Sequence, residues 1–270
     1  MDSFERSGLR FAVLDPTGPA EHTVVLLHGF PQQPATFNGV VSLLYDEGIR
    51  TLVPTQRGYT REARPLSRRG YRLTETAADV LALLDAAGVD KAHIVGHDWG
   101  GFQGWALGAW FPDRVASLTV LSTPHPAAML ESLVVSDQAL RSSYMAAFQI
   151  PVLPEAWAQR TLAKSLQDTR LPLKYVGRYA DAMAVPGALS GALGWYRGLP
   201  FSAGRKVGPC LVPTTYLWGR HDFALGRAAA ERTEKHVHAP YVFTELDAGH
   251  WLPEVEPEAV AEAVLERVAR

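Results

Sequence analysis

The chain has 270 residues, of which 28 are acidic, 26 are basic and 47% are hydrophobic. This share of apolar residues offsets chain entropy, which excludes an intrinsically disordered protein. A formal net charge of −2 lacks the basic excess that a nucleic-acid partner requires, and a single cysteine, Cys210, excludes an internal disulfide and a cysteine-rich zinc site.

The first residues and the hydropathy of the chain bear on its location. Residues 1–10 contain no apolar core of a secretion signal, and no run approaches the ~18 apolar residues of a membrane span. We therefore expect a cytoplasmic protein with no membrane partner. Length alone allows one large domain or two small ones, and the oligomeric state stays open.

Short β-branched runs alternate with helical stretches along most of the chain. This order is typical of an α/β fold in which helices flank a mostly parallel sheet. Because both faces of a central parallel strand are buried, its sequence is continuously apolar. Helical spacing of apolar residues predicts helices at 74–87, 102–111 and 256–270. The predicted strands are 23–27, 50–53, 92–95, 117–121, 214–218 and 241–244.

The alternation stops between residues 124 and 208. This segment has several prolines and helical runs at 140–148 and 155–166, but no strand-like run. It predicts a helical insertion between the fourth and fifth strands. The insertion either covers the sheet edge where α/β proteins bind ligands or is an ornamental subdomain. We expect a core formed by 1–123 and 209–270, with residues 124–208 as a helical cap.

A glycine-rich turn follows the strand at 92–95. Small residues at 96, 100 and 101 permit a sharp strand-to-helix reversal that exposes the side chain of Asp98. This is the pattern of a nucleophile elbow, with aspartate in place of the more familiar serine. Two other interpretations are a phosphate-binding turn, which would need a lysine that is absent, and a helix-capping aspartate.

Three further segments with candidate site residues follow predicted strands, in the chain order expected of a protein with a nucleophile elbow. The loop His28–Pro31 follows the first strand, Asp222 the fifth and His250 the sixth. Because the carboxyl ends of parallel strands meet at one edge, these residues can converge with Asp98. The order nucleophile, acid, histidine is that of the α/β-hydrolases.

The chain resembles the epoxide hydrolases among the α/β-hydrolases, over nearly its whole length. Four motifs and two cap segments carry the resemblance. They are HGFP at 28–31, GHDWGG at 96–101, the Asp222 and His250 loops, and the tyrosine segments 143–151 and 194–197.

The resemblance implies a separate catalytic role for each site residue. Asp98 would attack a saturated carbon and form an ester, which water activated by His250 would then hydrolyse. Asp222 would orient His250, and the backbone N–H groups of Phe30 and Trp99 would form the oxyanion hole. The Phe30–Pro31 bond would be cis. No metal or organic cofactor would be needed.

Two tyrosines would complete the reaction. Opening an epoxide releases an alkoxide, and Tyr144 and Tyr196 would donate protons to it from the cap. From position alone, tyrosines in a helical cap are more often packing residues. The expected partners are water and a small apolar epoxide. The predicted pocket residues are Phe30, Pro31, Trp99, Phe148, Trp195, Phe223 and Trp251.

Two rival functions use the same fold. A haloalkane dehalogenase would share Asp98 and His250 but would need N–H donors for the departing halide, for which Trp195 is a candidate. A ligand-binding protein without activity would be expected to have lost some catalytic groups, and none is missing here. Aspartate at position 98 disfavours an esterase.

Overall fold

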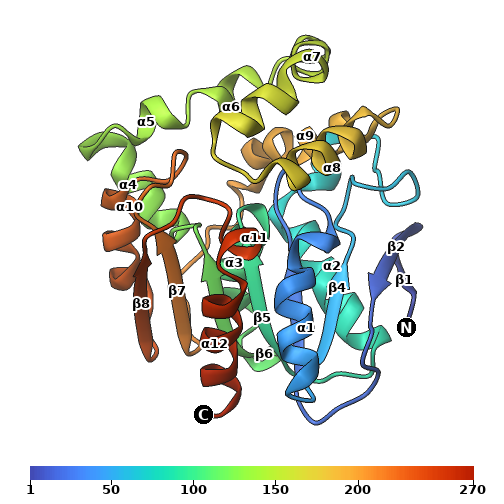
Figure 1. The fold of residues 1–270 in the computed structure, drawn as a ribbon, viewed down its shortest axis with the longest axis vertical. Helices are drawn as coiled ribbons and strands as arrows, with labels where there is room; N and C mark the ends of the chain where they lie inside the picture. The colour runs from blue at the N-terminus through green and yellow to red at the C-terminus, as the bar shows by residue number, and fades with distance from the viewer.

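The computed structural model describes all 270 residues and has an eight-stranded sheet flanked by helices (Figure 1). The spatial order is β1-β2-β4-β3-β5-β6-β7-β8. Pairing is parallel from β4 through β8 and antiparallel for β1 and β2. The strands are β1 Ser3–Arg6, β2 Leu9–Leu14, β3 Thr23–Leu27, β4 Arg50–Pro54, β5 Ala92–His97, β6 Val115–Leu121, β7 Thr214–Gly219 and β8 Tyr241–Leu246.

All six strands predicted from the sequence are present, and the α/β-hydrolase fold class is confirmed. The hairpin of β1 and β2 was not predicted from the sequence, because its residue pattern differs from that of the central strands. Burial along β2 alternates with period two, because an edge hairpin buries one face only. Ser7 and Gly8 both have positive φ, as a two-residue hairpin turn requires.

Helices cover both faces of the sheet. On one face α1 packs against α12, and on the other α2 packs against α3. Two shorter helices, α10 after β7 and α11 after β8, complete the core. The core helices are α1 Asn38–Asp46, α2 Leu73–Ala86, α3 Trp99–Trp110, α10 Arg227–Arg232, α11 Leu252–Val255 and α12 Pro257–Val268.

Between β6 and β7 the chain is helical, as the interrupted alternation predicts. Several of these helices lie above the carboxyl ends of the strands in Figure 1, whereas α4 lies beside α10 next to β7 and β8. The exact division at residues 124 and 208 stays a prediction. The helices are α4 Pro126–Val135, α5 Gln138–Arg141, α6 Tyr144–Ala147, α7 Leu153–Asp168, α8 Leu173–Ala184 and α9 Ala188–Gly198. Short 3₁₀ turns cover 34–37, 68–71, 112–114, 199–202 and 233–236.

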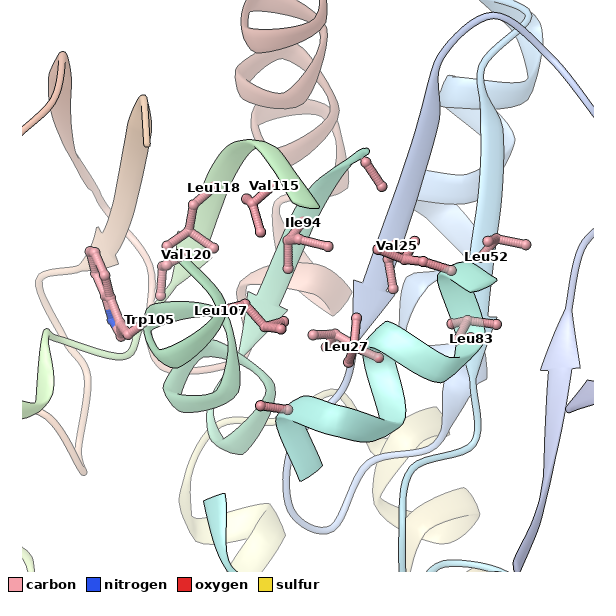
Figure 2. Close-up of a cluster of buried hydrophobic side chains, with 14 of the residues drawn as sticks. Val25, Leu27, Leu52, Leu83, Ile94, Trp105, Leu107, Val115, Leu118 and Val120 are labelled. Carbon is pink, nitrogen blue, oxygen red and sulfur yellow. The ribbon is translucent and has the colours of Figure 1, made fainter. Parts of the chain in front are cut away.

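Two apolar layers hold the sheet between its helices. Figure 2 shows the layer on the α2 and α3 side, where alternate residues of the central strands meet the helices. The strand residues that point the other way pack against α1 and α12. The central strands are therefore fixed from both sides, and their carboxyl ends form a rigid base for the site. Labelled members of the layer in Figure 2 include Val25, Leu27, Leu52, Leu83, Ile94, Leu107, Leu118 and Val120.

No helix combines the length and the apolar character that crossing a bilayer would demand.

Candidate active site

Asp98 stands at the tip of the turn between β5 and α3, with φ 52° and ψ −118°. Such a backbone is strained for a residue with a Cβ and persists only where the surroundings impose it. The glycines impose it. A Cβ on Gly96 would collide with the carbonyl of Gly100, and one on Gly100 with the carbonyl of Leu27. The side chain of Asp98 makes no capping bond to α3, so the capping interpretation has no support.

His250 lies between two carboxylates. Its Nδ1 is 2.8 Å from Oδ2 of Asp222, and its Nε2 is 3.9 Å from Oδ2 of Asp98. Oδ1 of Asp222 accepts hydrogen bonds from the backbone N–H groups of Ala224 and Leu225, at 2.8 and 2.9 Å. One oxygen of Asp222 is thus held by its own loop while the other faces the histidine. The structure therefore brings Asp98 together with Asp222 and His250, both of which lie more than a hundred positions later in the sequence.

The loop after β3 faces the same carboxylate. The backbone N–H of Phe30 donates to Oδ1 of Asp98 at 2.8 Å, and the Phe30–Pro31 bond is cis. Gln32 accepts from the N–H of Gly29 at 2.8 Å, and Tyr59 donates to the Gly29 carbonyl at 2.9 Å. These bonds fix the loop, so the Phe30 N–H is aimed at the carboxylate before any substrate arrives.

Burial and neighbouring charges shift the pKa values of the pair. Burial raises the pKa of Asp98, while His250 and the N–H groups of Phe30 and Trp99 act to lower it. Burial also opposes protonation of His250, but the carboxylates outweigh it and raise its pKa to about 9. Asp222 contributes most of this effect, followed by Asp98 and Glu254. The carboxylates around His250 therefore favour its cationic form at neutral pH.

Tyr144 of α6 and Tyr196 of α9 lie together, with ring centroids 5.9 Å apart. Burial raises the pKa of Tyr196 far above its ordinary value, and Tyr144 and Asp98 raise it further. Burial and then Asp98 likewise raise the pKa of Tyr144. Both phenols keep their protons at neutral pH and can act as hydrogen-bond donors.

The two tyrosine segments are braced by one buried arginine. Arg197 donates to the carbonyls of Phe148 and Ile150, at 2.9 and 2.8 Å, and pairs with Glu155 at 2.6 Å. The segment after Tyr144 is thereby joined to the helix that carries Tyr196. Neither Arg197 nor Glu155 was singled out from the sequence, since nothing local marks them as partners.

The predicted pocket residues differ in how they contact the site. Phe30, Trp99 and Phe148 surround the ring of Tyr196 at centroid distances of 5.5, 4.8 and 4.9 Å. The ring centroids of Phe223 and His250 are 5.3 Å apart, and Phe223 is 44% exposed, so it lies at the solvent-facing edge of the candidate active site.

The remaining two aromatic residues use their indole N–H groups elsewhere. Trp195 donates to the carbonyl of Arg57 at 2.8 Å, and Trp251 donates to Thr169, also at 2.8 Å. By contrast, the Nε1 of Trp99 is buried without a partner. Pro31 is buried beside Phe30 in the fixed loop.

A buried polar network behind His250 was missed from the sequence. His97 contacts Oε1 of Gln32 at 2.7 Å and the carbonyl of His250 at 2.8 Å. Gln32, Thr36 and Tyr179 all donate to Oε1 of Glu254, at 2.7, 2.6 and 2.6 Å. Glu254 follows His250 by four residues, a spacing that could have indicated a supporting role. No three His, Cys, Asp or Glu side chains are grouped so as to hold a metal ion.

Comparisons with known proteins identify the fold family. A family model described as alpha/beta hydrolase fold matches residues 22–257. The chain is 34% identical to the AB hydrolase superfamily protein YfhM of Bacillus subtilis (strain 168), covering 90% of this chain and 88% of that protein. It is 30% identical to epoxide hydrolase 4 of Homo sapiens, covering 94% and 74%. The crystal structure of epoxide hydrolase A from Mycobacterium thermoresistibile covers 99% of this chain and 97% of its own, with 26% identity and a TM-score of 0.85.

Proposed function

The chain belongs to the α/β hydrolase fold family, and on this premise we propose that it is an epoxide hydrolase that converts a small apolar epoxide to a vicinal diol. The observation that carries the proposal is a carboxylate, Asp98, at the elbow, with His250 and two protonated tyrosines about it. The similarity to proteins named epoxide hydrolases supports it. In this proposal, residues 124–208 act as the cap that brings both tyrosines over the core.

In the first half-reaction, an oxygen of Asp98 attacks an epoxide carbon. One C–O bond forms as the ring C–O bond breaks, and Tyr144 and Tyr196 hydrogen-bond to the departing oxygen and protonate it. The high pKa of both phenols supports this role, because each holds a proton at neutral pH. The product is an ester between Asp98 and the opened substrate.

In the second half-reaction, water attacks the carboxyl carbon of that ester. His250 takes one proton from water, and the N–H groups of Phe30 and Trp99 stabilise the oxyanion. The ester C–O bond then breaks and the diol oxygen takes the proton from His250. The second proton of the water restores the tyrosine that was deprotonated in the first half-reaction, so Asp98 returns to a carboxylate. Because Asp98 is neutral as an ester, it no longer raises the pKa of His250. We infer that alkylation removes the part of this pKa rise that Asp98 supplies, and so favours the neutral form of His250 that acts as a base.

The rival functions have weaker support. A departing halide would need two N–H donors, and the Trp195 N–H is already bonded to a backbone carbonyl. An esterase nucleophile forms an acyl-enzyme in which water attacks the acyl carbon of the substrate. An ester on Asp98 is instead hydrolysed at the carboxyl carbon of the enzyme. A binding protein without activity would not need His250 held between two carboxylates.

Mass spectrometry of the intact protein tests the mechanism. His250→Gln incubated with styrene oxide should gain the mass of one substrate, because ester formation does not need the histidine and hydrolysis does. Peptide mapping should place the adduct on Asp98, and Asp98→Asn should gain no mass. His22→Gln, a matched change at a half-exposed histidine, should turn the substrate over without accumulating the ester. Folded His250→Gln protein without an adduct across a panel of epoxides would overturn the proposal.

A further inference from the structure

The loop that carries Asp222 is held by side chains of a helix from the insertion. Gln138 of α5 is fully buried and contacts this loop twice. Its Nε2 donates to the carbonyl of Ala224 at 2.8 Å, and its Oε1 accepts from the N–H of Gly226 at 2.8 Å. Nε2 also donates to Ser142 at 3.0 Å, which fixes the orientation of the amide.

Arg141 of the same helix holds the preceding part of the loop. Its Nη1 donates to the carbonyls of Asp222 and Phe223, at 3.0 and 3.2 Å. Its Nε donates to Asp137 at 2.9 Å, so a second contact, separate from the loop, orients the guanidinium. A Cβ on Gly226 would lie 3.4 Å from Oε1 of Gln138, which is ordinary van der Waals contact.

These bonds add to the hydrogen bonds that the core makes with the loop. The N–H groups of Ala224 and Leu225 are used by Asp222 itself, and the Leu225 carbonyl accepts from Trp218 at 2.9 Å. The carbonyls of 222, 223 and 224 and the N–H of 226 are all bonded to α5. Thus both the core and the insertion hold the loop through hydrogen bonds.

We propose that Gln138 and Arg141 are positioning residues that hold Asp222 against His250, so that α5 controls the hydrolysis of the ester. The proposal rests on the proposed function, because it assigns the two residues to one of its half-reactions. Ester formation uses Asp98 and the two tyrosines, and neither Gln138 nor Arg141 is hydrogen-bonded to any of them. Hydrolysis uses His250 with its Nδ1 on Asp222, and small displacements of an oriented base reduce its rate strongly.

The test separates the two half-reactions in Gln138→Leu and Arg141→Met with styrene oxide. Rapid-quench mass spectrometry gives the rates of ester formation and loss. We expect ester loss to slow at least fivefold and ester formation to change less than twofold. In the steady state kcat and KM should fall together, and the esterified fraction should rise. Arg141→Lys, which retains a cationic donor, should recover part of the rate of ester loss.

A matched control removes a basic side chain elsewhere in the insertion. Lys164 of α7 is exposed and pairs only with Asp168, so Lys164→Met should leave both half-reactions unchanged. Equal slowing of both half-reactions in Gln138→Leu and Arg141→Met would indicate a general loss of structure and overturn the proposal. Unchanged ester loss in both variants would also overturn it.

A readout without substrate keeps this proposal separate from the proposed function. The proton between His250 Nδ1 and Asp222 gives a low-field NMR resonance when the hydrogen bond is short and protected. We expect it to exchange faster in Arg141→Met than in Lys164→Met. Equal exchange in the two variants would contradict the positioning role. If the wild-type protein forms no ester, the proposed function fails, and the resonance still tests whether α5 holds the Asp222–His250 pair.

Discussion

His250 Nε2 lies 3.9 Å from Asp98 Oδ2, close enough for the two charges to interact but beyond hydrogen-bond distance. Asp98 therefore acts on His250 mainly through its charge. Replacing Asp98 with asparagine removes the charge and should lower the pKa of His250 below about 9. NMR titration of the imidazole gives this value directly. Asp168→Asn, a change at an exposed carboxylate, should leave the pKa unchanged, and an equal pKa in Asp98→Asn would contradict the coupling.

The same shift predicts how stability depends on pH. A histidine whose pKa rises from 6.5 to about 9 on folding stabilises the protein fully below pH 6.5 and loses that contribution as pH rises through 9. The loss is on the order of 3 kcal/mol by linkage. Burial lowers the pKa of three other histidines to about 4, so in the folded protein they titrate below the pH range from 6.5 to 9. They are His28, His93 and His125. Urea unfolding at pH 6.5 and 9.5 should show a smaller loss for Asp98→Asn than for the wild type.

Removing one phenol should slow ester formation and spare ester hydrolysis. Because Tyr144 and Tyr196 are proposed to share the epoxide oxygen, each single change to phenylalanine should cost about 10- to 100-fold, and the double change about 10³-fold or more. Single-turnover measurement of the adduct on Asp98 gives the rate. Tyr45→Phe, at an exposed tyrosine of α1, is the control. Loss of ester hydrolysis in place of ester formation would exclude the proton-donor role.

The ion pair of Arg197 and Glu155 should stabilise the tyrosine segments. Both side chains are mostly buried, at 9% and 15% exposure, so Glu155→Gln should cost about 1 to 3 kcal/mol. Arg197 lowers the pKa of Glu155, so the difference from the wild type should shrink as pH falls through the folded-state value, below 4.5. Thermal unfolding at pH 7 and pH 4 tests both statements. Asp168→Asn, which breaks an exposed pair, should cost less than about 1 kcal/mol.

The elbow glycines should tolerate no side chain. Gly100→Ala places a methyl group against the backbone carbonyl of Leu27, which cannot move without displacing β3, and should cost about 3 kcal/mol or more. Gly177→Ala in α8 meets no atom within 4 Å and should stabilise the protein by up to about 1 kcal/mol. Chemical unfolding of the two variants compares the same substitution in both settings. Equal stabilities would contradict the packing at the elbow.

The sequence predicts the parts of this molecule that depend on local pattern. Central strands are recognisable because burial on both faces requires continuous apolar runs, and the turn at Asp98 because it requires glycines at fixed spacing. The hairpin of β1 and β2 was missed because it alternates, as a strand with one exposed face does. The alternating pattern of the hairpin is short and is hard to distinguish from the loop sequence around it.

Contacts between distant residues could not be predicted in the same way. Glu254 is buried among donors from 32, 36 and 179, and no single segment reveals that these side chains meet. The bonds from Gln138 and Arg141 to the Asp222 loop join residues more than eighty positions apart. Such contacts depend on how the insertion packs on the sheet, which composition and periodicity do not specify.

The attachment of α5 to the Asp222 loop has a consequence for engineering. Exchanging the whole segment 124–208 for that of a relative would replace Gln138 and Arg141 together with the residues that shape the pocket. A chimaera joined after Arg141 would keep the native contacts to the acid loop and change only the later helices. Libraries that aim at new selectivity should therefore begin their variation beyond residue 142.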